Sequence, residues 1–287
     1  MKHRMNISLR RQIDRYSFQL LLLGAALIAV LPFYWAMTLS IRDPMETFTV
    51  AGLAVPFVQF QPTLASWIEE LSVGEAQRAL TNSSIIALGT ALGLMVLGTP
   101  AAYALARFRF RRPSNQNLIL WFLSQRVLPP IVTVVPVFMI MRQLHLLDTR
   151  LALILVNITF NLPLVVIIVR QGFLDIPIEL EEAALVDGAN HAHVFWHLSL
   201  RLAVPSLMAA MLISIAYTWN EFLFAFMFLD DPDIFTLSRG VVSLNSSEVP
   251  RQHLMAGAVI ATVPILVIFL WFERFLVQGL TAGSVKG

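Results

Sequence analysis

Cysteine and lysine are the residues that this sequence lacks or nearly lacks. It contains no cysteine, which excludes disulfides, thiolate catalysis, iron–sulfur clusters and cysteine-ligated zinc. Its lysines are Lys2 and Lys286, and neither lies in the G-x-x-x-x-G-K-[ST] pattern that cradles the phosphates of a nucleotide. The sequence therefore contains no P-loop, and any work driven by ATP requires a separate ATPase.

Charged residues are also scarce. They make up 13% of the 287 residues, whereas a soluble domain has about 25%. Hydrophobic residues reach 57%, and the mean hydropathy is +0.72. The bilayer is therefore the expected solvent for most of the chain. The net charge of +2 is too small to indicate a nucleic-acid partner.

Apolar runs of about 20 residues, the length of a transmembrane helix, recur along the chain. They lie between Arg15 and Arg42, between Arg78 and Arg107, at about 117–141, between Arg150 and Arg170, from Arg201 to about 229, and at about 253–272. The first run is longer than a signal-peptide core of about 7–15 residues and lacks a small-x-small cleavage site, so we expect a retained anchor. We predict an all-α integral membrane protein with six transmembrane helices.

Basic residues predict the orientation in the membrane, because cytoplasmic loops carry an excess of arginine and lysine. Five basic residues lie in 1–15, and Arg107, Arg109, Arg111 and Arg112 follow the second apolar run. We expect both clusters, the loop after the fourth helix and both termini to be cytoplasmic, in a bacterial inner membrane. The four arginines are read as orientation anchors that contact lipid head groups, rather than as a nucleic-acid patch.

The expected organisation has five parts. They are a cytoplasmic tail at 1–16, a first transmembrane helix at 17–40, an extracytoplasmic segment at 41–79, a five-helix core at 80–277 with a cytoplasmic loop at 175–205, and a cytoplasmic tail at 278–287.

The loop at 175–205 carries small residues at helical spacing. Ala184 and Gly188 are four apart, so they share a helix face that another backbone can approach closely. We expect Asp175 to cap a short helix with Pro177 in its first turn, ending near Gly188, and Asn190 to cap the next helix. A solvated acidic loop helix is the alternative interpretation.

This loop resembles the EAA loop of ATP-binding-cassette importer permeases, and other motifs resemble the carbohydrate-uptake branch of that family. Those motifs are Asn82-Ser83, residues 101–108 (AAYALARF), 126–130 (RVLPP), 144–149 (LHLLDT), 219–222 (WNEF) and, similar to the tail of the maltose-type second permease subunit, 279–287 (GLTAGSVKG). They cover roughly residues 16–287 in the family order. One departure is Arg201, where the family has a proline, and it predicts a straighter exit from the loop.

The resemblance implies a type I importer permease fold and a non-catalytic subunit. The implied partners are a second permease subunit forming a heterodimer, an ATPase dimer that binds ATP and Mg, an extracytoplasmic solute-binding protein, a carbohydrate, and membrane lipid. It implies no cofactor in this chain. The residues implied in ATPase coupling are Glu182, Ala183, Ala184, Asp187, Gly188, Ala189, Phe195 and Pro205. Gly283, Ser284, Val285 and Lys286 would contact the ATPase, or form a frayed end.

Polar residues inside two apolar runs form a predicted translocation path. Arg126, next to Gln125, lies near mid-membrane, where an arginine costs about 2.5–3.5 kcal/mol and needs a partner such as Glu221 or carbonyls freed by nearby prolines. Trp219 and Asn220 beside Glu221 combine aromatic surface with polar groups, as a sugar requires. A structural role for Arg126, and a gate or subunit contact for the other three, stay open alternatives.

Other functions fit the sequence less well. An importer permease for a non-sugar solute is the main alternative, because the sequence does not identify the solute. An ion-coupled secondary carrier often has inverted repeats, and none is detectable. An intramembrane enzyme needs a nucleophile–base pair or metal ligands at membrane depth. His191, His193 and His197 have no carboxylate or cysteine to complete a zinc site, so we predict no metal.

Overall fold

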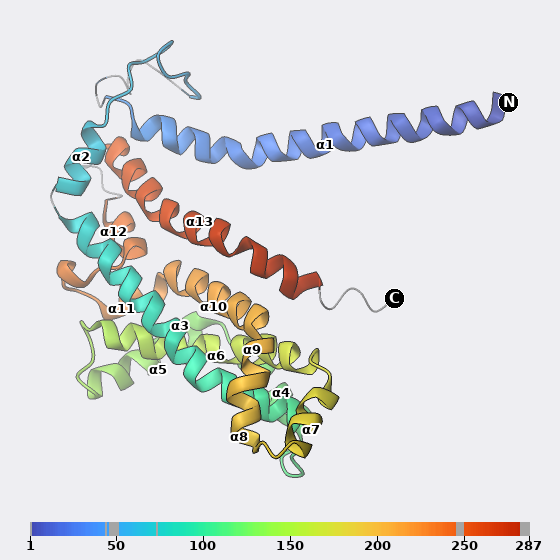
Figure 1. The fold of residues 1–287 in the computed structure, drawn as a ribbon. Helices are drawn as coiled ribbons and strands as arrows, with labels where there is room; N and C mark the ends of the chain where they lie inside the picture. Colours follow the sequence, from blue (N-terminus) through green and yellow to red (C-terminus); the bar gives the residue numbers. More distant parts are fainter. Residues whose placement is uncertain (1, 44, 46–51, 73, 245–249, 282–287) are drawn as a thin grey trace. The chain divides into compact units, whose positions relative to one another are not determined.

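The computed structural model describes residues 2–43, 45, 52–72, 74–244 and 250–281. These residues form helices and no β-strand, as predicted. In chain order the helices are α1 (Lys2–Ser40), α2 (Ala65–Ser72), α3 (Glu75–Arg107), α4 (Asn115–Gln125), α5 (Pro130–Gln143), α6 (Arg150–Leu174), α7 (Ile178–Val186), α8 (His191–Val194), the π-helix η2 (Phe195–Ser199), α9 (Leu200–Leu202), α10 (Val204–Trp219), α11 (Leu223–Phe228), the 3₁₀-helix η3 (Pro232–Ile234), α12 (Leu237–Ser243) and α13 (Arg251–Thr281) (Figure 1).

The apolar helices give four to six candidate spans, where six were predicted. Among the described residues, 4 single helices are long and apolar enough to cross a membrane: α1 from Arg15, α3, α6 and α13 up to Phe272. The α4–α5 pair is bent by 90°, and the segment 191–202 is bent by 72° against α10. The count reaches 6 when each bent pair is one span.

The chain divides into two compact units. The first comprises residues 1–73 and 244–259, and the second comprises residues 74–243 and 260–287. In the first unit, Trp67 of α2 donates its indole N–H to the Ser40 hydroxyl at the end of α1, over 3.1 Å. His253, near the start of α13, lies 3.1 Å from a carboxylate oxygen of Glu70. These contacts join α2 to α1 and to the beginning of α13.

Close helix packing holds the second unit together. A Cβ atom at Gly89 of α3 would lie 2.9 Å from Ile154 Cδ1 of α6, and one at Gly93 would meet Ile158 of the same helix. These glycines therefore allow the two helices to pack closely, because a larger residue would push α3 away from α6.

Two buried hydrophobic clusters lie along α3 and α6. One includes Tyr103, Phe173 and Phe195, and it supports the end of the bundle from which α7 extends. The other includes Ile86 and Phe228 and lies beside α5 and α11. The polar features described below lie next to these two clusters.

Candidate functional site: a surface helix and a polar cavity

Helix α7 follows α6 after a short turn. Pro177 occupies its N-cap position, and no side chain caps the helix there. The carboxylate of Asp175 instead accepts a hydrogen bond from Gln171 Nε2 at 3.0 Å. The prediction that Asp175 caps α7 is therefore wrong. Asp175 lies one turn beyond Gln171 at the end of α6, where the two side chains meet.

The end of α7 has the glycine and the following cap that the sequence predicted. Gly188 has φ +94°, and its N–H donates to the carbonyl oxygen of Leu185 at 3.1 Å. The side chain of Asn190 accepts a hydrogen bond from the His193 N–H at 2.8 Å and caps α8. A Cβ atom at Gly188 would meet nothing within 4 Å. The backbone conformation, rather than space within the chain, requires glycine there.

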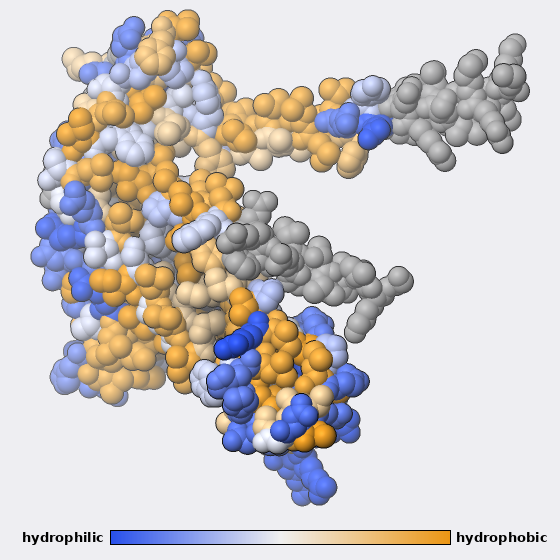
Figure 2. Space-filling view, in the orientation of Figure 1, coloured by the Kyte–Doolittle hydropathy of each residue, from blue (hydrophilic) through white to orange (hydrophobic). Residues whose placement is uncertain are grey.

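Much of α7 and the residues after it is exposed. Val186 is 86% exposed, which is unusual for a valine. Figure 2 shows hydrophobic residues framed by hydrophilic ones at the end of this unit, where α7 and α8 lie. The α7 surface, as we call it, consists of the exposed residues Ile178, Leu180, Glu182, Ala183, Val186, Asp187 and Gly188. Exposed apolar residues rimmed by polar ones mark an interaction site.

A buried carboxylate on the opposite side of α7 fixes the helix to the bundle. Glu181 Oε1 lies 2.9 Å from Arg107 Nε, at the end of α3. Tyr103 donates to Glu181 Oε2 at 3.1 Å, and Ser199 of η2 donates to Oε1 at 2.8 Å. Arg107 also donates to the carbonyl oxygen of Ile176 at 3.0 Å. One carboxylate therefore ties α7 to α3 and to η2.

Sequence reasoning missed this network. Arg107 was predicted to anchor the chain at the lipid head groups, but its side chain is 8% exposed and paired with Glu181, so that prediction is wrong for Arg107. Arg109, Arg111 and Arg112 are exposed. The available signal was the spacing of Tyr103 and Arg107, which places two polar groups on one helix face.

Two of the residues implied in ATPase coupling, Phe195 and Pro205, lie outside α7. Phe195 is 9% exposed and packs on Tyr103, with ring centroids 4.8 Å apart, so it supports the loop from within. Pro205 is in the first turn of α10. The exit from the loop is not straight, because the segment 191–202 and α10 are bent by 72° against each other. Pro205 lacks the N–H that would bond Arg201, which favours an interruption of the helix at this point.

A cavity of about 600 Å³, lined by both polar and apolar side chains, lies elsewhere in the same unit. Its lining includes Gln125, Arg126, Asn220 and Glu221 from the predicted translocation path. Trp219 does not line it. Its indole N–H instead donates to the Ala261 carbonyl of α13 at 3.0 Å. The structure thus brings together residues that are nearly a hundred positions apart.

The cavity lies beside the break between α4 and α5. Helix α4 ends at Gln125, and α5 starts at Pro130, with a bend of 90°. The guanidinium of Arg126 lies 5.3 Å from the centroid of the Tyr217 ring. A cation–π contact of this kind partly compensates the charge of the arginine.

Glu221 has a local role. Its carboxylate accepts the N–H of Phe224 at 2.7 Å and that of Ala225 at 3.1 Å, so it caps the first turn of α11. Within the described residues it makes no ion pair with Arg126. Sequence reasoning also missed Asn157 and Asn161, which line the cavity from successive turns of α6. Two amides in an otherwise apolar run were the available signal.

The remaining predicted residues add little to either site. The rings of His193 and His197 stack with centroids 4.1 Å apart. The part of the chain that the structure describes holds no group of three ligands suited to a metal ion. Gly283, Ser284, Val285 and Lys286 lie outside the described residues.

An all-helical chain with several apolar spans, a cavity beside a broken helix pair and an exposed helix tied to the bundle is the arrangement expected of a membrane permease. Comparison with known protein families matches residues 95–282 to the "Binding-protein-dependent transport system inner membrane component" family. The chain belongs to this family of ABC importer permeases, and it is an inner-membrane component.

Individual relatives agree with this family. The chain is 36% identical over 262 residues to the "Trehalose transport system permease protein SugB" of Mycobacterium tuberculosis (strain CDC 1551 / Oshkosh), covering 90% of this chain and 93% of the relative. It is 32% identical over 276 residues to the "Trehalose/maltose transport system permease protein MalG" of Thermococcus litoralis, covering 93% and 96%.

A solved structure supports the fold. The chain matches a "bacterial ABC transporter involved in the import of the acidic polysaccharide alginate" with a TM-score of 0.77 and 22% sequence identity. The match covers 92% of this chain and 96% of that chain. At this identity the likeness supports the type I importer permease fold rather than the solute.

Proposed function

We propose that this chain is one of two permease subunits of an ATP-driven carbohydrate importer. Both termini and the loop at 175–205 would be cytoplasmic, and the segments at 41–79 and 230–252 extracytoplasmic. The distribution of arginines supports this orientation. The chain itself would make and break no bond, and a partner ATPase dimer would bind ATP and Mg.

The observation that carries this proposal is the α7 surface. A valine that is 86% exposed beside Ala183 and Gly188 leaves a small, partly apolar surface on a helix that is otherwise fixed. Such a surface fits a cleft on a partner protein, because small residues permit close approach and apolar area favours association. The ATPase is the expected occupant.

The buried network gives this surface a mechanical role. Glu181 ties α7 to Arg107 and thereby to α3. The other end of the loop continues through η2 to the bend before α10. A displacement of α7 would therefore act on α3 and α10 together. ATP-driven closure of the ATPases would move the loop and change access to the cavity, as alternating access requires.

The cavity supports a polar solute of moderate size. A volume of about 600 Å³ lies within the range of about 300–1,000 Å³ for ligand sites. Its lining combines amides, Arg126 and aromatic side chains, which suits hydroxyl groups and the apolar face of a sugar ring. The relatives named for trehalose and maltose transport favour a carbohydrate. An importer for a different polar solute is the second candidate, because amide-lined cavities also bind such solutes.

The partners follow from this function. We propose a heterodimer with a second permease subunit. We also propose an extracytoplasmic solute-binding protein, which agrees with the binding-protein dependence in the family description. The tail residues Gly283, Ser284, Val285 and Lys286 would also contact the ATPase. Membrane lipid would surround the assembly.

Val186→Asp tests the ATPase contact. The substitution places a charge on the α7 surface at a side chain that is 86% exposed. We expect the purified permease pair to lose its ATPase during size-exclusion chromatography, with uptake of the solute reduced at least tenfold. Val242→Asp is the matched control, because Val242 is an exposed valine of α12. Retention of the ATPase and normal uptake in Val186→Asp would contradict the proposal.

A further inference from the structure

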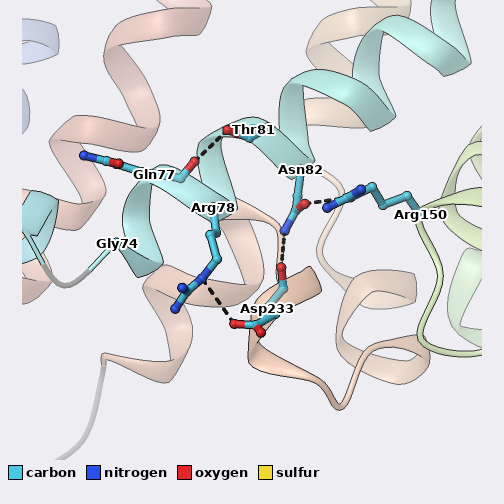
Figure 3. Close-up of a pocket in the computed structure, with 7 residues that line it drawn as sticks. All are labelled: Gly74, Gln77, Arg78, Thr81, Asn82, Arg150 and Asp233. Carbon is cyan, nitrogen blue, oxygen red and sulfur yellow. Dashed lines mark hydrogen bonds and ion pairs between the residues drawn. The ribbon is translucent and has the colours of Figure 1, made fainter.

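A second polar pocket lies in the same unit, at the beginning of α3. Its volume is about 490 Å³, and its lining consists of Gly74, Gln77, Arg78, Thr81, Asn82, Arg150 and Asp233 (Figure 3). Every lining residue except Gly74 has a polar side chain, and the lining has no aromatic ring. This composition differs from that of the cavity at Arg126, and the two share no residue.

Asn82 is the buried centre of this pocket. It is 1% exposed, and its amide N–H₂ donates to the carbonyl oxygens of Asp233 at 2.9 Å and of Phe235 at 3.0 Å. Its Oδ1 accepts from Arg150 Nε at 2.7 Å. Figure 3 shows Asn82 between η3 and the start of α6. One buried amide therefore holds Arg150 and the η3 segment in place.

Two guanidinium groups line the pocket and retain donors for a ligand. Arg78 pairs with Asp233 through Nε at 3.2 Å, and these side chains are 49% and 69% exposed. Arg150 is held through Nε alone. Within the described residues, the terminal nitrogens of both arginines make no hydrogen bond. Paired guanidinium donors of this kind match the two oxygens of a carboxylate.

The pocket lining carries a net positive charge, because Asp233 offsets only one of the two guanidinium groups. Asp148 Oδ1 accepts the backbone N–H groups of Asp230 and Asp231, at 2.6 and 3.0 Å. Asp231 Oδ1 accepts the N–H of Asp233 at 2.9 Å. Both carboxylates thus accept backbone N–H groups of the segment 230–233. The lining itself carries two positive side chains and one negative side chain.

The pocket faces the side of the membrane opposite α7. Thr81 and Arg107 lie on the same continuous helix, about 39 Å apart at about 1.5 Å per residue. This distance exceeds the hydrocarbon thickness of about 30 Å. If α7 is cytoplasmic, as proposed above, the pocket is extracytoplasmic. Arg150 also lies about 10 Å along α6 from Asn157 of the solute cavity.

We propose that this pocket receives an acidic side chain of the solute-binding protein. This inference rests on the proposed function, which supplies the orientation and the partner. The incoming carboxylate takes the terminal nitrogens of Arg150 and competes with Asp233 for Arg78. The open, ring-free pocket fits a protein carboxylate better than a sugar ring, which favours aromatic surface. Docking here places the binding protein over the mouth of the cavity at Asn157.

The test uses the complete importer in lipid nanodiscs with its purified, solute-loaded binding protein. The measurement is the binding-protein concentration that gives half-maximal stimulation of ATP hydrolysis. We expect Arg78→Gln combined with Arg150→Gln to raise this concentration about tenfold or more, because charge-assisted hydrogen bonds are lost. ATP hydrolysis without binding protein should not change. Arg142→Gln is the matched control, because Arg142 is an exposed arginine at the end of α5 that does not line the pocket.

Two further measurements keep the outcomes separate. Arg78→Gln alone should raise the half-maximal concentration by a smaller factor. It should not affect folding, because Arg78 pairs with the exposed Asp233. Two results would overturn the inference. In the first, the double variant and Arg142→Gln need the same concentration of binding protein for half-maximal stimulation. In the second, the double variant changes the affinity for the solute but not the affinity for the binding protein. If the unsubstituted importer is not stimulated by any binding protein, the proposed function itself fails.

Discussion

Glu181 and Arg107 form an ion pair that the protein encloses almost completely. Glu181 Oε1 and Arg107 Nε are 2.9 Å apart, and the side chains are 7% and 8% exposed. The pair joins the exposed helix α7 to the longest helix of its unit, α3. A displacement of one of these helices is therefore transmitted to the other.

Removing one partner of this pair should uncouple the permease. Arg107→Gln leaves the Glu181 carboxylate buried with no cation beside it, and breaking a buried pair costs about 3–5 kcal/mol. We expect a lower thermal unfolding midpoint and ATP hydrolysis that no longer responds to solute. Differential scanning fluorimetry and ATPase assays in nanodiscs measure both effects.

A double-variant cycle separates this pair from a general defect. Arg107→Gln with Glu181→Gln should lose less stability than the sum of the single variants, because neither charge is then left unpaired. Arg109→Gln is the control, since Arg109 is exposed on the following loop. Strict additivity of the two single effects would argue against a direct coupling between these residues.

Gly188→Ala should loosen the end of α7. The residue has φ +94°, a conformation that costs an L-amino acid about 1–2 kcal/mol. Hydrogen–deuterium exchange should therefore become faster in the peptide containing Ala184 and Ala189. Gly24→Ala adds the same methyl group where nothing lies within 4 Å and φ is unstrained. Equal exchange in the two variants would show that conformation does not explain this glycine.

Arg126→Ala should reduce solute uptake without affecting assembly of the permease with its ATPase. The guanidinium lines the cavity and is held over Tyr217 rather than by an acidic partner. We expect solute uptake to fall about tenfold, with co-purification of the ATPase unchanged. Radiolabelled uptake and chromatography give the two measurements.

Trp219→Phe is the contrast to this variant. The indole N–H of Trp219 donates to the carbonyl oxygen of Ala261, outside the cavity lining. Loss of this hydrogen bond should lower the free energy of unfolding by about 0.5–1.5 kcal/mol and leave the solute affinity unchanged. If Arg126→Ala transports normally while Trp219→Phe changes the affinity, the assignment of the solute path is wrong.

The absence of cysteine makes the orientation directly testable. Single substitutions Val186→Cys and Asp230→Cys introduce one thiol each at exposed positions into a chain without background labelling. In membranes that contain the permease pair without its ATPase, an impermeant maleimide should label Asp230→Cys in intact spheroplasts and Val186→Cys only in inverted vesicles. The reverse pattern would reject the proposed orientation and, with it, the ATPase contact at α7.

Composition and periodicity were sufficient for the class of protein and for its helices. Apolar runs of about 20 residues indicate transmembrane helices, because a helix of that length crosses the bilayer and satisfies its own backbone hydrogen bonds. Short-range signals were also reliable where one residue decides the geometry. Gly188 ends α7 and Asn190 caps α8, as predicted. Asp175 failed as a cap because Gln171, one turn earlier on α6, binds its carboxylate.

Long-range pairing was decided by the tertiary structure alone. Arg126 and Glu221 looked like partners because each is a charge in an apolar run, yet Glu221 caps α11 and Arg126 lies over Tyr217. Arg107 was predicted to be a lipid anchor, but in the structure it is buried in an ion pair with Glu181, which lies far along the chain. A sequence pattern shows that a buried charge needs a partner. Which partner it finds depends on how the helices pack, and that packing is a property of the whole bundle.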